Sequence, residues 1–327
     1  MSIQIIGGSG FLGTFLGSHL REESIDFSIF DMKPRGPYLN CTSACDVTDI
    51  ESLRKNLNSN CLINLAAIHR DDIQPKSLYE SVNVNGARNI CTVAREKSIS
   101  KIIFVSSVAV YGNSGSIKDE SAPKEYFNEY GRTKNEAEQV FKEWFEEDES
   151  RSLIIIRPTV IFGPGNRGNI YNLLNQIYSK KFLMIGKGEN IKSICYVKNV
   201  AAFITYCVGL NPGIHTFNYI DKPDFNMNEF VSLTQKTLKR KNTIFRVPVF
   251  VGLLGGKVMD FLSLILRKSL TISAIRVKKF ISNSHFDTSI FKNTTFEAPY
   301  NLEQSLIETI EYEFLEDNSN KQVFETE

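Results

Sequence analysis

The feature that most constrains this chain is a glycine-rich turn near its beginning. An apolar run, Ile3–Ile6, is followed at once by GGSGFLG and then by a helical pattern over Phe11–Glu22. Glycines at every third position permit a tight turn, close approach of a ligand to the backbone, and a helix N-terminus directed at a pyrophosphate. Because a strand precedes them and a helix follows, a dinucleotide site is favoured over a plain tight turn. The predicted contacts are Gly7, Gly10, Phe11, Leu12 and Gly13.

Strand and helix patterns alternate through the first half of the chain. The predicted strands are Ile3–Ile6, Phe27–Phe30, Leu62–Leu65, Ile102–Val105 and Leu153–Ile156. The predicted helices are Phe11–Glu22, Ile50–Leu57, Lys76–Lys97 and Tyr126–Glu147. Strands without polar alternation are buried on both faces. Their alternation with helices predicts an α/β fold with a doubly wound parallel sheet.

The second half of the chain is less regular. Asn169–Lys180 and Val200–Val208 are predicted to be helical and Ser193–Val197 extended, and helices and loops mix further on. We predict a dinucleotide-binding domain of residues 1–160 with about 191–221, and a smaller mixed α/β substrate lobe of about 161–190 with 222–314. Residues 315–327 are polar and are expected to form a loose tail.

Bulk composition excludes several function classes. The 327 residues are 42% hydrophobic and 23% charged, as in an ordinary soluble globular protein. A formal net charge of +1 argues against nucleic acid as the main partner. The six cysteines are scattered without a CxxC pair, and the four histidines offer no matching ligands, so no metal site is expected. Without a signal peptide pattern, reduced thiols in a cytoplasmic protein are the expectation.

One apolar stretch, Val247–Leu266, needs separate treatment. Its longest uncharged run is too short to cross a bilayer, and Lys257 and Asp260 then interrupt it. No membrane span is therefore expected. A buried or dimer-facing helix is the first interpretation, and a helix lying on a membrane surface is the alternative.

The residues after the second and third strands predict the rest of a dinucleotide site. Asp31 follows Gly13 by 18 residues, where a carboxylate can accept hydrogen bonds from both ribose hydroxyls of NAD and would repel the extra phosphate of NADP. Lys33 and Arg35 could soften that preference, and a solvated loop position is the alternative for Asp31. Further expected contacts are Asp46 and Val47 in CDVTD, and Leu65, Ala66 and Ala67 in NLAA.

A tyrosine and a lysine four residues apart, in EYGRTK, follow the fourth strand. On a helix, Tyr130 and Lys134 share one face. A free tyrosine has a pKa of about 10, and a nearby ammonium favours the phenolate and lowers that pKa. Tyr130 can then exchange the proton of a substrate hydroxyl. Ser107, at the end of the fourth strand, would hold the reacting oxygen by a hydrogen bond.

Taken in order, these motifs resemble the extended short-chain dehydrogenase/reductase family, and within it the NAD-dependent nucleotide-sugar epimerase/dehydratase group. The resemblance rests on GGSGFLG, Asp31, NLAA, VNVNGARN, SSVAVYG, YGRTK and RPTVIFGPG, and it is strong over roughly residues 1–200. It implies a Rossmann domain, bound NAD, the triad Ser107, Tyr130 and Lys134, and a UDP-linked or similar sugar. It adds Asn83, Ser106 and Pro158 as cofactor contacts. It also implies a homodimer formed through Lys76–Lys97 and Tyr126–Glu147.

Departures from the family pattern narrow the reaction. Dehydratases of the group carry acids directly after the triad serine, and Val108 and Ala109 hold those places here. The cysteine used there by 3,5-epimerase/reductases is also missing. A 4-epimerase and a 4-keto-6-deoxy-sugar reductase remain, and Asp31 favours the epimerase because it points to NAD. A non-catalytic NAD-binding protein is a third hypothesis, against which the complete triad argues.

The substrate side is predicted by resemblance alone. Asn169 and Lys192 match positions that contact the diphosphate, Arg276 is a candidate second phosphate ligand, and His69 is expected near the sugar. Lysine at 192 keeps the charge of the arginine usual in the family but loses its bidentate fork. Ser282 and Ser284, where some epimerases carry a bulky tyrosine, leave room for a 2-acetamido group. The expected reaction is therefore 4-epimerisation of UDP-GlcNAc or a related sugar.

Overall fold

The structure is a computed structural model that describes residues 2–70, 73–112, 116–240, 243–266, 274–317 and 321–324. The side chains of residues 261–266, 275, 276, 279 and 291 lie outside this description.

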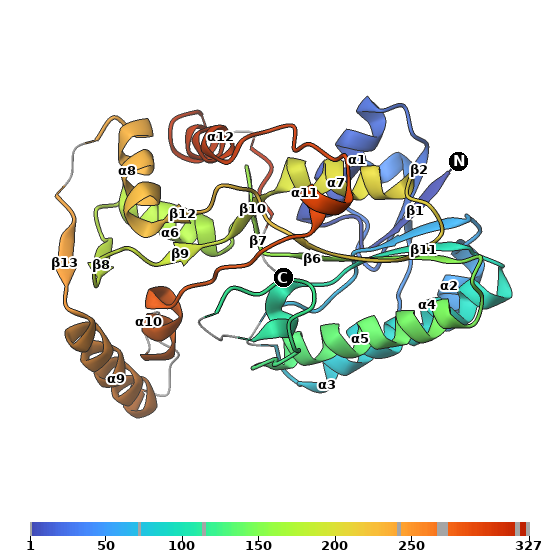
Figure 1. Ribbon diagram of the computed structural model, residues 1–327, viewed down its shortest axis with the longest axis horizontal. Coiled ribbons are helices and arrows are strands. Elements are labelled where there is room, and N and C mark those ends of the chain that lie inside the picture. Colours follow the sequence, from blue (N-terminus) through green and yellow to red (C-terminus); the bar gives the residue numbers. More distant parts are fainter. Residues whose placement is uncertain are drawn as a thin grey trace.

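A parallel sheet of seven strands forms the centre of the molecule, in the order β11-β6-β5-β4-β1-β2-β3 (Figure 1). The strands are β1 Ile3–Ile6, β2 Phe27–Asp31, β3 Thr42–Ala44, β4 Cys61–Asn64, β5 Lys101–Val105, β6 Ser152–Pro158 and β11 Gly213–Tyr219. From β1 the chain adds β2 and β3 on one side and then returns to add the others on the opposite side. The crevice at the carboxyl ends of β1 and β4 is therefore the topological switch point, where such sheets bind their ligands. The predicted doubly wound α/β fold is confirmed.

Helices cover both faces of this sheet (Figure 1). On one face lie α1 Phe11–Glu22 and α7 Val197–Val208, and on the other lie α2 Ile50–Asn56, α4 Gly86–Glu96 and α5 Glu129–Glu146. Successive residues of a strand serve opposite faces: Ile63 packs in the core with α1 and α7, whereas Leu62 packs in the core with α4 and α5. This two-sided burial explains the uninterrupted apolar strands in the sequence.

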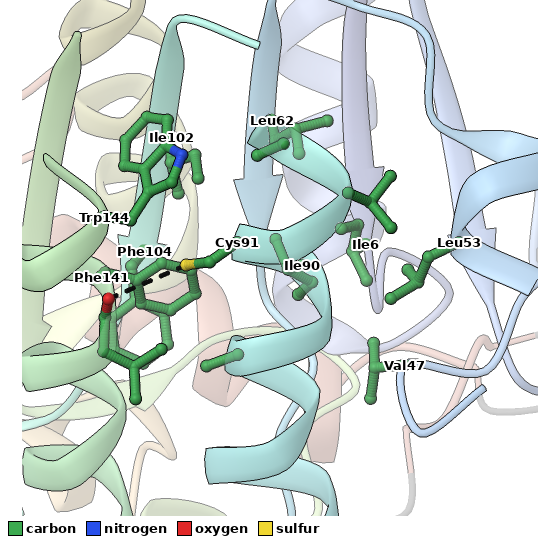
Figure 2. Close-up of a cluster of buried hydrophobic side chains, with 14 of the residues drawn as sticks. Ile6, Val47, Leu53, Leu62, Ile90, Cys91, Ile102, Phe104, Phe141 and Trp144 are labelled. Atoms are coloured by element: carbon green, nitrogen blue, oxygen red, sulfur yellow. Dashed lines mark hydrogen bonds between the residues drawn. The ribbon is translucent and has the colours of Figure 1, made fainter. Parts of the chain in front are cut away.

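The core under α4 and α5 holds the helix of the EYGRTK motif against the sheet. Figure 2 shows Phe104 of β5 beside Phe141 of α5, with Trp144 near them and Cys91 reaching toward them from α4. The ring centroids of Phe104 and Phe141 are 4.7 Å apart, and Trp144 is fully buried. The Cys91 thiol donates to the carbonyl oxygen of Val140 at 3.9 Å. Large rigid side chains thus fix the height of α5 over β5.

The predicted helix Lys76–Lys97 is observed over residues 77–96, but it is not α-helical throughout. It consists of α3 Ser77–Tyr79, a π-helical turn over Glu80–Asn85, and α4. Single π turns inside helices are common at functional sites. Here the turn carries Asn83, whose side chain is buried against the loop after β4.

Two strands of the sheet were not predicted. Strand β3 has three residues, two of them exposed, and carries no apolar pattern. Strand β11, at the opposite edge, reads GIHTFNY, in which polar residues interrupt the apolar ones. Both positions are edges of the sheet, where a strand is buried on fewer sides and its sequence signal is weaker.

The remaining elements form a smaller mixed region beside the sheet (Figure 1). Its helices are α6 Asn169–Tyr178, α8 Met227–Thr237, α9 Val249–Leu266, α10 Ala274–Ile281 and α12 Leu302–Phe314. Helix α11 Ile290–Asn293 instead packs on the large sheet, where Ile290 joins the core under α1 and α7. Its strands pair as β7 Val160–Phe162 with β10 Ile194–Tyr196, β8 Leu183–Ile185 with β13 Phe245–Val247, and β9 Ile191–Lys192 with β12 Phe225–Asn226. A separate apolar core joins α6, α8 and α12. The proposed division into two domains at the predicted boundaries stays a prediction.

The apolar stretch Val247–Leu266 corresponds largely to α9, and several large side chains in its described part, residues 249–260, are not buried. Phe250, Leu254 and Val258 are all exposed. Of the predicted interpretations, only a dimer-facing helix and a membrane-surface helix therefore remain. None of the helices in the described ranges has both the length and the apolar content to cross a bilayer.

The polar tail is not loose throughout. Phe324 exchanges backbone hydrogen bonds with the loop at Gly165 and Arg167, and its ring lies edge-on to Phe11 at 5.3 Å between centroids. The contacts of Phe324 therefore order this part of the tail, although the residues around it are polar.

All six cysteines are free thiols in the structure, and five of them are buried. Burial raises the pKa of Cys61 to about 11 and that of Cys91 to about 12. Cys41 is the one that is only partly buried.

Candidate active site

The glycine turn between β1 and α1 has the geometry that a pyrophosphate requires. Gly7 has φ +75°, and a Cβ on it would lie 2.6 Å from the Cα of Ala66. A Cβ on Gly13 would lie 2.2 Å from the carbonyl oxygen of Gly8. Gly10 caps α1 without a side chain, and no atom lies within 4 Å of where its Cβ would be. The N-terminus of α1, with Phe11 as its first residue, therefore opens onto free space suited to an anion.

Asp31 stands at the end of β2, beside this turn. The backbone amide of Ser9 donates to Asp31 Oδ2 at 2.9 Å, and that of Lys33 donates to Oδ1 at 2.9 Å. These bonds hold the carboxylate next to the glycine turn, where it can accept ribose hydroxyls. Arg35 lies at the same turn, with its Nε 3.4 Å from the carbonyl oxygen of Ser9. This placement of the Asp31 carboxylate suits a dinucleotide whose ribose has a free 2′-hydroxyl.

The CDVTD loop lies next to Asp31. The amide of Cys45 donates to the carbonyl oxygen of Asp31 at 3.0 Å, which places Asp46 and Val47 directly beyond the end of β2. Asp46 Oδ1 accepts from the Thr48 amide at 2.8 Å, and Val47 is buried. The loop is thus a rigid neighbour of the ribose position.

Leu65, Ala66 and Ala67 follow β4 and form the opposite wall of the turn. Asn83 holds this loop in place: its Oδ1 accepts from the Ile68 amide at 2.8 Å, and its Nδ2 donates to the Ile68 carbonyl at 3.0 Å. The same Nδ2 donates to Thr133 Oγ1 on α5 at 2.9 Å. Asn83 therefore ties the cofactor wall to the helix that carries Tyr130, a link that the sequence did not reveal.

Ser107 and Tyr130 come from adjacent elements at the same edge of the sheet. Ser107 follows β5 and caps a 3-10 turn, Val108–Tyr111, with its Oγ accepting from the Ala109 amide at 3.1 Å. Tyr130 is in the first turn of α5, whose cap residue Asn128 accepts from the Gly131 amide at 2.9 Å. A Cβ on Gly131 would lie only 2.4 Å from the carbonyl oxygen of Ala109. This close approach sets the first turn of α5 directly on the segment of Ser107.

Lys134 lies one turn below Tyr130 and is only 2% exposed. Its ammonium donates to the carbonyl oxygen of Val105 at 2.6 Å and lies 4.2 Å from the centre of the Phe104 ring. Burial lowers the pKa of Lys134 to about 7, and the nearby Glu138 carboxylate opposes that shift. The lysine is thus held near its titration point at neutral pH.

A buried ion pair supports the triad from beneath. Glu138 accepts two bonds from Arg157, at 2.8 Å from Nε and 2.6 Å from Nη2, and both side chains are 2% exposed. The Ser106 hydroxyl donates to Glu138 at 2.6 Å, and Arg157 also donates to the Tyr111 hydroxyl at 2.6 Å. The Ser106 side chain is therefore committed to this network, and its predicted contact with the cofactor stays a prediction. Pro158, the last residue of β6, is buried next to Arg157 in sequence.

On the substrate side, the structure brings together Lys192 and the SNSHFDTS segment. Lys192, in β9, donates from Nζ to the Ser282 carbonyl at 2.6 Å, and Ser284 bonds through its amide to the Ile191 carbonyl at 3.0 Å. Burial lowers the pKa of Lys192 to about 8. Asn169 is the first residue of α6 and is exposed, as is His69 in the loop after β4. Arg276 belongs to α10, but its side chain lies outside the described residues.

Comparison with known proteins identifies the family. A profile described as the NAD dependent epimerase/dehydratase family matches residues 3–218. The chain belongs to this family. It is 43% identical over 319 residues, 96% of each chain, to the N-acetyl-alpha-D-glucosaminyl-diphospho-ditrans,octacis-undecaprenol 4-epimerase of Escherichia coli O157:H7. It is 26% identical to the UDP-glucose 4-epimerase of Vibrio cholerae, over 79% of this chain and 82% of that one.

The solved structure of the UDP-glucose 4-epimerase of Thermotoga maritima with UDP-glucose shares the fold. The TM-score is 0.74 over 95% of this chain and 98% of that one, at 17% identity. As a member of the family, the protein is an NAD-dependent enzyme of the epimerase type. The glycine turn, the open N-terminus of α1 and the Asp31 carboxylate all fit NAD. The predicted family, enzyme class and cofactor are therefore confirmed.

Residue roles within this epimerase stay predictions, with the structure giving their places. The glycine turn, Asp31, the loops after β3 and β4, Ser107, Tyr130 and Lys134 all lie at the carboxyl edge of the sheet. The side chain of Asn83 binds the backbone of Ile68, and that of Ser106 binds Glu138. Gly131, Thr133 and Glu138 were missed as contributors. Gly131 could have been noticed, because a glycine one residue after a catalytic tyrosine implies close packing of the helix start.

Proposed function

We propose that this enzyme interconverts GlcNAc and GalNAc at C4 while the sugar is joined by a diphosphate to undecaprenol or a similar polyprenol. The observation that carries the proposal is the 43% identity, over 96% of both chains, to an epimerase named for that lipid-linked substrate. The UDP-linked sugar predicted from the sequence becomes the second candidate. It is favoured by the more distant likeness to UDP-glucose 4-epimerases.

The residues at the crevice suit exchange of a proton at a carbinol. We assign Tyr130 the transfer of the C4 hydroxyl proton and Ser107 the hydrogen bond that orients that oxygen. Lys134, one turn away, supplies charge that favours the Tyr130 phenolate. NAD, when bound, supplies the reversible hydride acceptor at C4. The apolar side chains of Val108 and Ala109 supply no acid for loss of water, which argues against a dehydratase.

Epimerisation differs from simple reduction because the 4-keto sugar must present both of its faces in turn. A ligand held by its diphosphate can turn its sugar while the carrier stays in place. Lys192 offers one positive charge for that diphosphate, beside the small side chains of Ser282 and Ser284. Both candidate substrates carry a diphosphate, so both would bind Lys192 in the same way. They differ only in the group on the far side of the diphosphate, uridine or polyprenol.

A homodimer in the cytoplasm is part of the proposal. The surface between α4 and α5 contains a groove of about 470 Å³. It is lined by Arg88, Cys91, Thr92, Arg95, Glu136, Gln139, Val140 and Glu143. This is the pair of helices through which the family resemblance implies dimerisation. Light scattering of the purified protein tests it, and a monomer at micromolar concentration would contradict it.

The decisive experiment incubates purified protein, without added cofactor, with GlcNAc-diphospho-polyprenol in detergent micelles and, separately, with UDP-GlcNAc. We expect the GalNAc epimer to form faster in the lipid-linked reaction, and Tyr130→Phe to lose activity while remaining folded. Turnover that requires NADPH and a 4-keto sugar would instead identify a reductase. No turnover with any of these substrates would indicate a non-catalytic NAD-binding protein.

A further inference from the structure

Helix α9 presents apolar side chains to the outside of the protein. Phe250 is 71% exposed and Leu254 61%, and Val258 is exposed as well. These three residues stand four apart, so they form one stripe along the helix. A helix at the surface of a globular protein normally turns such a stripe inward. The stripe of Phe250, Leu254 and Val258 therefore needs an apolar environment that the described residues of this chain do not supply.

Within residues 249–260, the part of α9 whose side chains are described, two glycines lie on the inward side, together with the half-buried Leu253 and Met259. A Cβ on Gly252 would lie 2.7 Å from Ile185 of β8, and Gly256 is buried. Small residues here let the helix lie close to β8, while Phe250, Leu254 and Val258 point outward. Figure 1 shows α9 at one end of the molecule, far from the seven-stranded sheet and next to α10.

The charge around this helix is positive. Residues 245–281 contain seven lysines and arginines and one aspartate, although the whole chain has a net charge of only +1. The rest of the chain is therefore net negative. Arg246, Lys257 and Lys278 are exposed in the structure. An apolar stripe beside exposed cations matches the surface of a bilayer that contains anionic lipids.

The α9–α10 pair also leads to the predicted diphosphate ligand. Directly after α10, the carbonyl oxygen of Ser282 accepts from Lys192 Nζ at 2.6 Å. Within α10, the carbonyl oxygen of Phe280 accepts from Asn190 Nδ2 at 2.9 Å. The end of α10 is thus fastened to β9 on both sides of Ile191. Helix α10 therefore connects Lys192 to α9, because it also packs against α9.

We propose that α9 lies in the headgroup layer of an anionic phospholipid bilayer, with Phe250, Leu254 and Val258 directed toward the acyl chains. This inference rests on the proposed function, because a polyprenol-linked sugar is available only at a membrane. Lys257 and Asp260 keep the helix in the plane of the surface, since charged groups at the centre of a bilayer are costly. Docking through α9 would place Lys192 close to the diphosphate of the lipid.

Flotation of the full-length protein with vesicles tests the proposal. We expect wild-type protein to float with vesicles of phosphatidylglycerol and phosphatidylethanolamine, more weakly at high salt, and hardly at all with phosphatidylcholine alone. The double variant Phe250→Gln, Leu254→Gln should lose about tenfold or more in partitioning. The matched control is Leu315→Gln, which changes a leucine that is 50% exposed at the end of α12, and it should float like wild type.

Three results would overturn the proposal: wild-type protein that stays in solution, a double variant that floats like wild type, or an equal loss in Leu315→Gln. Dissociation of the oligomer in the double variant, with flotation unchanged, would assign α9 to a second copy of this chain. Turnover of the lipid-linked substrate in micelles tests the proposed function separately. Turnover without flotation refutes only the membrane docking of α9. Flotation without turnover refutes only the proposed epimerase reaction.

Discussion

Replacing Gly131 with alanine should move the proposed catalytic residues Ser107 and Tyr130 apart without unfolding the protein. An alanine Cβ would lie 2.4 Å from the carbonyl oxygen of Ala109 and 3.0 Å from the Cβ of Tyr126. Restoring a normal contact of about 3.5 Å requires a movement of roughly 1 Å between α5 and the segment of Ser107. Because Tyr130 directly precedes Gly131, that movement changes the position of its hydroxyl relative to Ser107.

The expected loss is large for activity and small for stability. A misplacement of about 1 Å costs about 100-fold in rate, which is roughly 2.7 kcal/mol in activation free energy. In the unfolding free energy, strain of about 1–3 kcal/mol is partly offset by about 1 kcal/mol from the better helix propensity of alanine. The kcat of epimerisation should therefore fall much more than the melting temperature.

The assay compares kcat, KM and thermal unfolding for wild type, Gly131→Ala and a matched control. Gly209→Ala is that control, because its Cβ would meet its nearest atom, the Tyr206 carbonyl oxygen, at an ordinary 3.5 Å. We expect Gly209→Ala to retain wild-type kcat. A Gly131→Ala enzyme whose kcat stays within about threefold of wild type would refute the reasoning, since a shift of about 1 Å cannot leave the rate intact.

Three further predictions concern the charged groups of the site. Burial lowers the pKa of Lys134 to about 7 in the folded protein. Between about pH 7 and 10 the unfolded chain therefore binds one more proton than the folded protein, so the unfolding free energy rises with pH. Denaturant titrations at several pH values should show a smaller rise in Lys134→Met. Glu138→Gln leaves the Arg157 charge buried without its partner and should lower the unfolding free energy by about 3–5 kcal/mol, whereas Glu147→Gln, at the exposed pair with Arg95, should cost far less in the same titration. Asp31→Ser removes the acceptor for the ribose hydroxyls and should weaken NAD binding by about tenfold or more, with NADP gaining relative to NAD in calorimetric titrations.

Local motifs were sufficient to predict the centre of the fold and to select candidate site residues that the fold places at one edge of the sheet. The glycine turn, the carboxylate at the end of the second strand, and Tyr130 with Lys134 each depend on a few neighbouring residues. Their spacing is dictated by helix and strand geometry, so it is visible in the sequence. The bounds of α1, Phe11–Glu22, were predicted as observed for the same reason.

Features that depend on distant parts of the chain were not predictable. The bond between Asn83 and Thr133 joins residues 50 apart, and the π-helical turn is stabilised by that tertiary setting. The contact between Gly131 and Ala109 is likewise a property of packing. For α9, hydrophobicity alone could not tell a buried helix from an exposed one, because the answer depends on which side its glycines face.

The burial of the thiols makes the protein suitable for labelling at one position. A thiol-reactive dye needs an accessible thiolate, and burial denies this to Cys45, Cys61, Cys91, Cys195 and Cys207, whose pKa values are all raised. Cys41, in the short turn before β3, is only partly buried. Strand β3 pairs with the end of β2, where Asp31 lies. Cys41 lies three residues before Ala44, the partner of Asp31, so a fluorophore on it would sit about 10 Å from the proposed adenosine site and could follow NAD release without mutation of the native sequence.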